Sequence, residues 1–281
     1  MSSISKELSI TVLVENTVYQ RGLLAEHGLS FWIESEGKGI LFDTGQGMAF
    51  PPNAQELHIP LEKAQAIVLS HGHYDHTGAL LYTLGKNTDA RIFLHPDALK
   101  ICYHKPKDAA SREIGISKQA REKLKAIENR ILWTEKPQQI MQGIYATGSI
   151  PRETEYENTG GDFFLDEQGN HPDPIADDQS IWLETSKGIV VLLGCAHSGV
   201  INTLRYIERL ACTQKFYALI GGMHLVHASP ERLKATAEAL SRYNFTILAP
   251  AHCTGFMAIS FLHKHFPNSF RTCSTGTKFS F

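Results

Sequence analysis

The stretch AIVLSHGHYDHTGAL, residues 66–80, constrains the fold more than any other part of this sequence. Its first five residues are apolar or small, which is typical of a buried strand. Directly afterwards come His71, His73, Asp75 and His76. Titratable side chains that gather where a strand ends are typical of a functional site, because a rigid sheet holds the loops that carry them.

Apolar runs of the same character recur in both halves of the chain, and each ends in a polar or glycine-containing turn. In the first half they predict strands at residues 10–16, 30–35, 39–45, 66–72 and 90–95. In the second half they predict strands at residues 143–150, 180–186, 188–195, 217–222 and 245–250. Helical patterns follow several of the later strands, at residues 198–211, 229–244 and 256–266. This order predicts an α/β (α+β) fold in which two mixed sheets pack together with helices on their outer faces, a four-layered αββα sandwich.

The length of 281 residues is enough for one large domain with a sizeable core. We expect a single domain over residues 1–281. Residues 96–180 are more polar and less regular than the rest, apart from a helix-prone stretch at 117–130. We interpret the region 96–180 as a loop or cap insertion that shapes a pocket.

The composition excludes several classes of partner. A formal net charge of −2 gives no reason to expect nucleic-acid binding. The N-terminus lacks a basic segment followed by an apolar one, and no apolar run is long enough to span a membrane, so a cytoplasmic protein is expected. The five cysteines show no CxxC spacing, which favours reduced thiols that mostly fill the core.

The histidine cluster has the spacing of a metal site. In an extended segment alternate side chains share a face, so His71, His73 and Asp75 point the same way, whereas His76 joins them only if the chain turns. Imidazole and carboxylate ligands fit one or two divalent ions, with zinc favoured and manganese, iron or magnesium as alternatives. Three further histidines follow apolar runs and small residues, namely His197, His224 and His252.

At these residues the chain resembles the metallo-β-lactamase fold superfamily, whose HxHxDH signature is intact at residues 71–76. The resemblance covers essentially the whole chain. The segments LFDTGQG, LSHGHYDHTG, GCAHSGVINTL, GGMHL and APAHCTG resemble, more narrowly, the branch named for 7,8-dihydropterin-6-methyl-4-(β-D-ribofuranosyl)aminobenzene-5′-phosphate synthase. The resemblance implies the metallo-β-lactamase-like αββα sandwich and a dinuclear metal site.

The resemblance also implies roles for individual residues. One metal would be held by His71, His73 and His197, and the second by Asp75, His76 and His252. Asp43 in LFDTG would be a carboxylate that fixes the cluster loop. Many hydrolases of this superfamily carry a bridging aspartate where this chain reads LIGGMHL, residues 219–225, without an Asp. His224 lies there instead and could ligate a metal, contact the substrate or act as an acid, so Asp75 and His224 are the candidate catalytic residues.

Weaker candidates line the expected pocket. Resemblance to the branch indicates Glu26 and His27, although a surface turn is an alternative for both. Arg152 follows a Gly-Ser-Ile-Pro turn and could bind a phosphate or carboxylate, or it could be a solvated loop residue.

Three functions remain open at this point. The first is a metal-dependent hydrolase that acts on a phosphoester, ester or lactone through a metal-activated water. The second is a transferase that joins a dihydropterin diphosphate to a ribofuranosylaminobenzene phosphate. The third is a metal-bearing binding or sensory protein with little turnover. The expected partner is a small, phosphorylated substrate, with no nucleic acid and no membrane, and the oligomeric state is left open.

Overall fold

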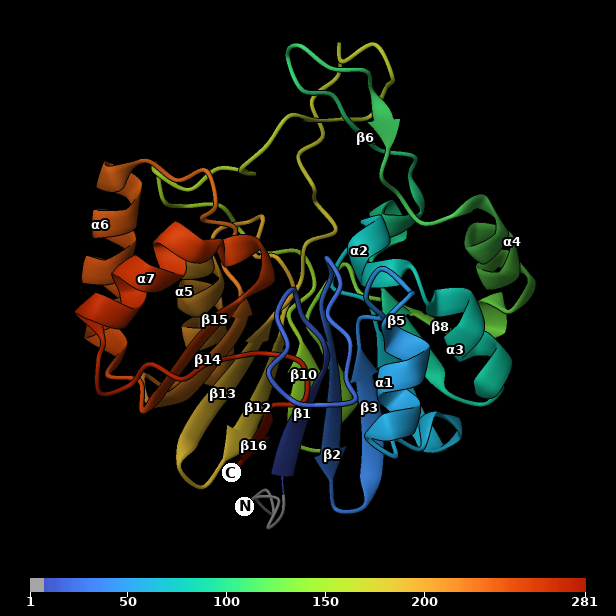
Figure 1. Ribbon diagram of the computed structural model, residues 1–281, viewed down its shortest axis with the longest axis horizontal. Coiled ribbons are helices and arrows are strands. Elements are labelled where there is room, and N and C mark those ends of the chain that lie inside the picture. The colour runs from blue at the N-terminus through green and yellow to red at the C-terminus, as the bar shows by residue number, and fades with distance from the viewer. Residues whose placement is uncertain (1–7) are drawn as a thin grey trace.

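The computed structural model describes residues 8–281, and two large sheets form its centre (Figure 1). The seven-stranded sheet has the order β16 (Lys278–Ser280), β1 (Leu8–Val14), β2 (Ser30–Ser35), β3 (Lys38–Phe42), β4 (Ala64–Val68), β5 (Arg91–Leu94) and β8 (Ile131–Trp133). The six-stranded sheet has the order β15 (Ile247–Ala251), β14 (Phe216–Gly222), β13 (Gly188–Leu193), β12 (Ile181–Thr185), β10 (Ile144–Ala146) and β9 (Gln138–Met141). The α-helices are α1 (Phe50–Glu56), α2 (Tyr74–Thr77), α3 (Leu80–Lys86), α4 (Lys118–Ala126), α5 (Val200–Ala211), α6 (Pro230–Leu240) and α7 (Phe256–His265). The 3-10 helices are η1 (Leu61–Lys63), η2 (Pro96–Leu99), η3 (Glu128–Arg130), η4 (Ser241–Tyr243) and η5 (His252–Thr254).

Successive side chains of a strand point to opposite faces of its sheet, so each sheet packs on both faces and the molecule has four layers. In β1, Ile10 and Val12 face the second sheet and pack with residues such as Val190 and Ile220 in one core between the sheets. The opposite face of the first sheet packs against α1, α3 and α4, and the opposite face of the second sheet packs against α5, α6 and α7. Figure 1 shows these helices on the two outer sides of the paired sheets. The predicted αββα sandwich is confirmed.

Local sequence signals explain several element boundaries. Glu36 and Gly37 both have positive φ and form the tight turn between the antiparallel strands β2 and β3. Ser229 caps α6, because its side chain accepts a hydrogen bond from the backbone N–H of Arg232, and Pro230 follows at the first helical position. Both sheets change from antiparallel to parallel pairing, at β3–β4 and at β13–β14.

The region expected to be an insertion contributes to both sheets. Within residues 96–180, α4 packs on the first sheet, β8 joins that sheet, and β9 and β10 join the second. The part outside the two large sheets contains a small sheet with the order β11 (Phe163–Phe164), β6 (Tyr103–His104) and β7 (Arg112–Glu113). This small sheet lies in the projection at the top of Figure 1, above the strand ends where the histidines lie.

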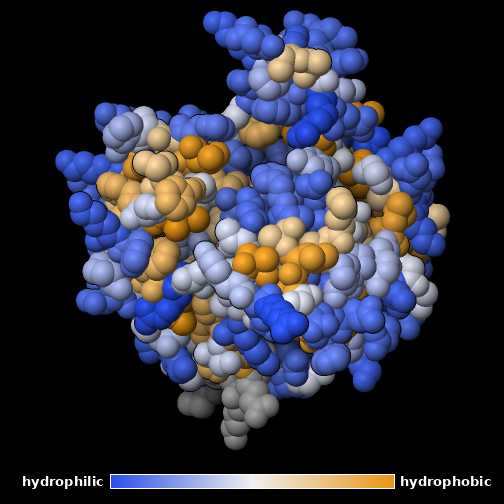
Figure 2. All heavy atoms as spheres, viewed as in Figure 1, coloured by the Kyte–Doolittle hydropathy of each residue, from blue (hydrophilic) through white to orange (hydrophobic). Residues whose placement is uncertain are grey.

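The surface is mixed in character. In Figure 2 the projection with the small sheet is largely hydrophilic, whereas hydrophobic residues gather over α7. Phe256 and Met257 at the start of α7 are 79% and 75% exposed. Within residues 8–281, no helix combines the length and apolar character that crossing a membrane requires.

Candidate metal centre

The candidate residues meet because several strands end at the same edge of the sandwich. Strands β3 and β4 are parallel, as are β13, β14 and β15, so their carboxyl ends point to the top of Figure 1. The side chains that follow these ends include Asp43, His71, His73, His197, His224 and His252. The helix α2, which begins directly after His73, supplies the turn that brings Asp75 and His76 to the same place.

The first predicted ligand set converges. His71, His73 and His197 each offer one ligand atom, and these atoms lie within 4.8 Å of one another. All three side chains are buried, and the Nε2 atom of each has no hydrogen-bond partner within residues 8–281. A buried imidazole nitrogen without a partner costs free energy. Three such atoms facing one point fit a divalent cation, which would accept their lone pairs.

The second predicted set also converges. His76 Nε2 lies 3.3 Å from His252 Nε2, and His252 Nε2 lies 3.3 Å from Asp75 Oδ2. His27, one of the weaker candidates, joins them with its Nε2 atom 3.2 Å from Asp75 Oδ2. The His27 side chain is 55% exposed, so it lies between the buried cluster and solvent.

Asp43 is hydrogen-bonded to His76 directly and is linked to His71 through Ser70. Its buried carboxylate accepts hydrogen bonds from His76 Nδ1 at 2.7 Å and from the Ser70 backbone N–H at 2.6 Å. It also accepts the Ser70 hydroxyl at 2.7 Å, which leaves Ser70 Oγ to accept from His71 Nδ1 at 2.8 Å. The hydrogen bonds therefore place a ring proton of His71 and of His76 on Nδ1, so Nε2 is the atom of each ring that faces the cluster and could bind a metal.

Acceptors from distant segments orient two further histidines. His197 Nδ1 donates to the Thr159 backbone carbonyl at 2.9 Å, and His252 Nδ1 donates to Asn16 Oδ1 at 2.8 Å. The Glu15 carboxylate accepts the backbone N–H of His252 at 2.7 Å. The Nε2 atom of His197 is again left for a ligand, whereas His252 Nε2 lies beside Asp75 and His76.

Two neighbouring aspartates tie down the ligand-bearing loops. Asp177 accepts the Gly72 backbone N–H at 2.7 Å, between two candidate ligands, and Asp178 accepts the Ser198 N–H at 2.8 Å, next to His197. Burial raises the pKa of Asp177 to about 7. The sequence analysis missed both residues, since an Asp-Asp pair in a polar loop carries no signal of its distant partners.

The charge states divide the cluster into two parts. Burial lowers the pKa of His71 and of His197 and lowers that of His73 to about 4, so these imidazoles are neutral at pH 7. Burial alone would lower the pKa of His76, but the Asp43 carboxylate raises it to about 9. Burial would raise the pKa of Asp75, but hydrogen bonds from His252 and His27 hold that pKa well below its usual range.

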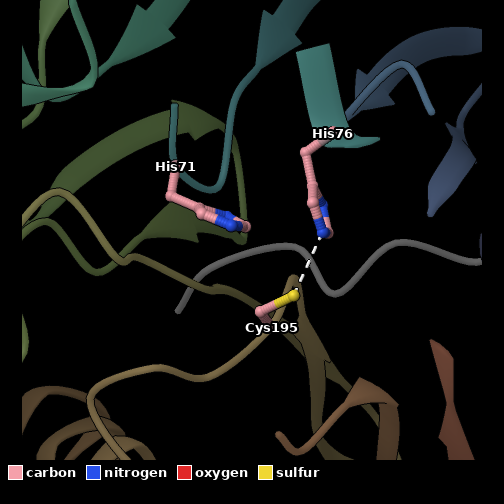
Figure 3. Close-up of side chains that lie close together, drawn as sticks. All are labelled: His71, His76 and Cys195. Atoms are coloured by element: carbon pink, nitrogen blue, oxygen red, sulfur yellow. Dashed lines mark hydrogen bonds between the residues drawn. The ribbon is translucent and has the colours of Figure 1, made fainter. Parts of the chain in front are cut away.

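Two buried cysteines, Cys195 and Cys253, lie inside the cluster beside the predicted ligands. Cys195 Sγ lies 3.1 Å from His76 Nε2, and His71 is close by (Figure 3). Cys253 Sγ lies 3.6 Å from the Cys195 backbone carbonyl. The five cysteines are all free thiols.

His224 lies between the cluster and a cleft. Its ring centroid is 4.2 Å from that of His197, and its Nε2 donates to the Gly160 carbonyl at 3.2 Å. The cleft has a volume of about 780 Å³ and is bounded by the loop at 155–162 and the start of α6. Arg232 also lines this cleft and is 9% exposed. His224 is the only candidate named from the sequence that lines it, among residues 8–281.

Two weaker candidates have structural partners instead. The Glu26 carboxylate accepts the backbone N–H groups of Gly47, Met48 and Ala49, so it fixes the loop that leads into α1. Arg152 donates to the carbonyls of Pro174 and Ile175 in an exposed loop and does not line the 780 Å³ cleft. Neither arrangement points its charge at the candidate ligands.

Comparison with known proteins places the chain in a family. The family model described as the Metallo-beta-lactamase superfamily matches residues 24–252, so the chain belongs to this superfamily. The 7,8-dihydropterin-6-methyl-4-(beta-D-ribofuranosyl)-aminobenzene-5'-phosphate synthase of Methanocaldococcus jannaschii is 30% identical over 270 residues, 92% of this chain and 91% of the relative. Protein MJ0448 of the same organism is 36% identical over 254 residues, 89% of this chain and 92% of the relative. The solved structure of Tm1679, a metal-dependent hydrolase of the beta-lactamase superfamily, is 27% identical with a TM-score of 0.79 and covers 97% of this chain and 98% of its own.

Proposed function

We propose that this protein is a metal-dependent hydrolase that acts on a phosphoester, ester or lactone. The observation that carries the proposal is the convergence of three buried Nε2 atoms without partners, on His71, His73 and His197. His76, Asp75 and His252 would hold a second ion beside the first. Divalent ions bound there would supply Lewis acidity, which acidifies water and polarises a phosphoryl or carbonyl oxygen.

The surrounding residues would prepare the site for this chemistry. Asp43 and Ser70 hold the rings of His71 and His76 in the orientation that ligation requires. His224 lines the cleft and approaches His197, so it is placed to donate a proton to a leaving group. Burial would lower the pKa of His224, but Cys253 raises it above its ordinary value, which favours the protonated form that an acid needs.

The cleft beside His224 would receive a small-molecule substrate. Arg232 is 9% exposed, lines the cleft and has an Nε atom without a partner within residues 8–281. A guanidinium in that position supports a phosphorylated substrate. Glu155, Asp162 and Glu231 also line the cleft, which favours hydroxyl or amine groups on the rest of the substrate.

The test combines metal content with turnover. Protein loaded with zinc or manganese is assayed against phosphomonoesters, phosphodiesters, carboxylic esters and lactones, alongside His73→Ala and the exposed control His171→Ala. We expect His73→Ala to lose metal and turnover together and His171→Ala to keep both. A metal-free His73→Ala protein that is as active as the parent would end the proposal.

A second candidate function rests on the identity of 30% with the dihydropterin synthase. On this alternative the chain transfers a dihydropterin group from its diphosphate to a ribofuranosylaminobenzene phosphate. Diphosphate release that requires both substrates would favour the transferase, whereas release from a single substrate would favour the hydrolase. Full metal occupancy without turnover in either assay would favour a binding or sensory protein.

A further inference from the structure

Cys195 occupies the centre of the cluster. Its Sγ atom lies within 4.8 Å of a ligand atom of His71 and His76, and equally of His197 and His224. The Cys195 Sγ atom also lies within 4.8 Å of a possible ligand atom of His252 and of the Cys253 Sγ atom. The thiol therefore lies within 4.8 Å of possible ligand atoms from both predicted ligand sets.

The backbone around Cys195 holds the thiol in this position. β13 ends at Leu193, and Ala196 has a φ of 53°, so the chain turns sharply directly after Cys195. Gly222 at the end of β14 makes room for it, since a Cβ there would lie 3.3 Å from the Cys195 Cα atom and 2.7 Å from Cys253 Sγ. Cys195 is only 2% exposed, so its thiol faces the cluster and not solvent.

Two imidazoles close to the thiol each have a nitrogen without a hydrogen-bond partner in the part of the chain that the structure describes. The Nε2 atoms of His71 and His197 are buried and have no hydrogen-bond partner within residues 8–281. Both histidines have a possible ligand atom within 4.8 Å of Cys195 Sγ. The Cys195 thiol lies 3.1 Å from His76 Nε2, itself a predicted ligand atom, and also interacts with the Cys253 side chain. A thiol that fills core volume would face apolar side chains, as the small-hydrophobe behaviour of buried cysteine predicts. Cys195 faces imidazoles instead.

We propose that Cys195 is a metal ligand that bridges the two histidine sets, in place of the aspartate that this chain lacks at residues 219–225. This inference rests on the metal centre of the proposed function. On binding, the thiol loses its proton to solvent or to a neighbouring imidazole, and a sulfur–metal bond forms. Thiolate ligation favours zinc or iron over magnesium and manganese, so it also narrows the choice of metal.

X-ray absorption and cobalt spectroscopy test the proposal on the whole chain. Zinc-loaded protein should show a sulfur neighbour at about 2.3 Å from zinc. Cobalt-loaded protein should show a thiolate-to-cobalt charge-transfer band that grows in proportion to bound cobalt. Cys195→Ser should lose both signals, whereas Cys253→Ser and the buried control Cys102→Ser should keep them.

Each outcome decides something different. Bound metal without a sulfur neighbour in the parent protein would overturn the role of Cys195 but leave the metal centre standing. A sulfur signal that survives in Cys195→Ser and disappears in Cys253→Ser would overturn it in favour of Cys253. If the parent protein binds no metal, both the metal centre and the role of Cys195 as its ligand are refuted. If Cys195→Ser does not fold, a sulfur signal retained in Cys253→Ser still assigns the ligand to Cys195, because the other cysteines lie outside the cluster.

Discussion

Replacing Asp43 with Asn tests how the chain orients its candidate ligands. The carboxylate accepts three hydrogen bonds, from His76 Nδ1 and from the backbone and hydroxyl of Ser70. An amide of the same shape has one oxygen, and its NH₂ group must face a donor. If the NH₂ faces His76, the ring proton moves to Nε2, which is the atom expected to bind metal. If it faces the Ser70 N–H, a buried donor loses its acceptor.

The size of the effect follows from these contacts. Changing the group that orients a metal-bound histidine typically costs roughly 10- to 100-fold in metal affinity, or about 1.4 to 2.7 kcal/mol. Asp43 reaches His71 through Ser70 and reaches His76 directly, so Asp43→Asn should weaken both ions. Ser70→Ala removes the acceptor of His71 but keeps the 2.7 Å hydrogen bond from His76 Nδ1 to Asp43, so it should weaken mainly the ion held by the set His71, His73 and His197.

Zinc titration against a chromophoric chelator measures the two dissociation constants. The titration is run at pH 7 and near pH 9, because a His76 pKa of about 9 makes a proton compete with the ion at neutral pH. Ser30→Ala is the control, since that hydroxyl donates to the backbone carbonyl of Asp43 and not to its carboxylate. An Asp43→Asn protein that binds both ions with the affinity of the parent at pH 9 would refute the reasoning.

Three further changes test the surroundings of the site. Glu157→Gln should lower the free energy of unfolding by about 1 to 2 kcal/mol in urea, because the buried carboxylate accepts two backbone N–H groups at the start of α5. Asp177 has a pKa raised from 3.8 to about 7 by burial, so the folded state binds more protons than the unfolded state and stability falls as pH rises through that window. Asp177→Asn should therefore gain stability relative to metal-free parent between pH 5 and pH 8, by at most about 4 kcal/mol, and equal differences at both pH values would contradict this. Gly194→Ala should lower both thermal stability and metal content, because the new Cβ would lie 2.2 Å from Ser70 Oγ and must displace the group that orients His71.

The fold was predictable where strands are long and buried. The runs at 30–35 and 188–195 alternate or are continuously apolar, and both form central strands. The edge strands β8, β9 and β16 were not predicted, because each has only three or four residues and depends on a neighbour for its hydrogen bonds. The strands within residues 96–180 that belong to the two large sheets are equally short. The sequence therefore did not distinguish them from the loops of the expected insertion.

The candidate metal ligands were predictable because they lie in motifs that can be recognised in the sequence. His71, His73 and His197 converge as the resemblance implied, because strand ends at one sheet edge bring them together. The partners that orient the ligands were not predictable, since Asn16 and His252 are 236 positions apart and Glu157 is an ordinary loop residue in sequence. Cys195 and Cys253 stand beside predicted ligands in the sequence, so thiol ligation was an open alternative, but a thiol next to a histidine is equally compatible with a filled core, which was the favoured interpretation.

Metal content is the most direct test of the account. Protein purified without added metal or affinity chelation is measured for moles of each element per chain, alongside His73→Ala. We expect about two ions per chain, zinc or iron in preference to magnesium, and a clear loss of metal in His73→Ala. A parent protein without bound metal, which also fails to take up zinc when it is supplied, would contradict it.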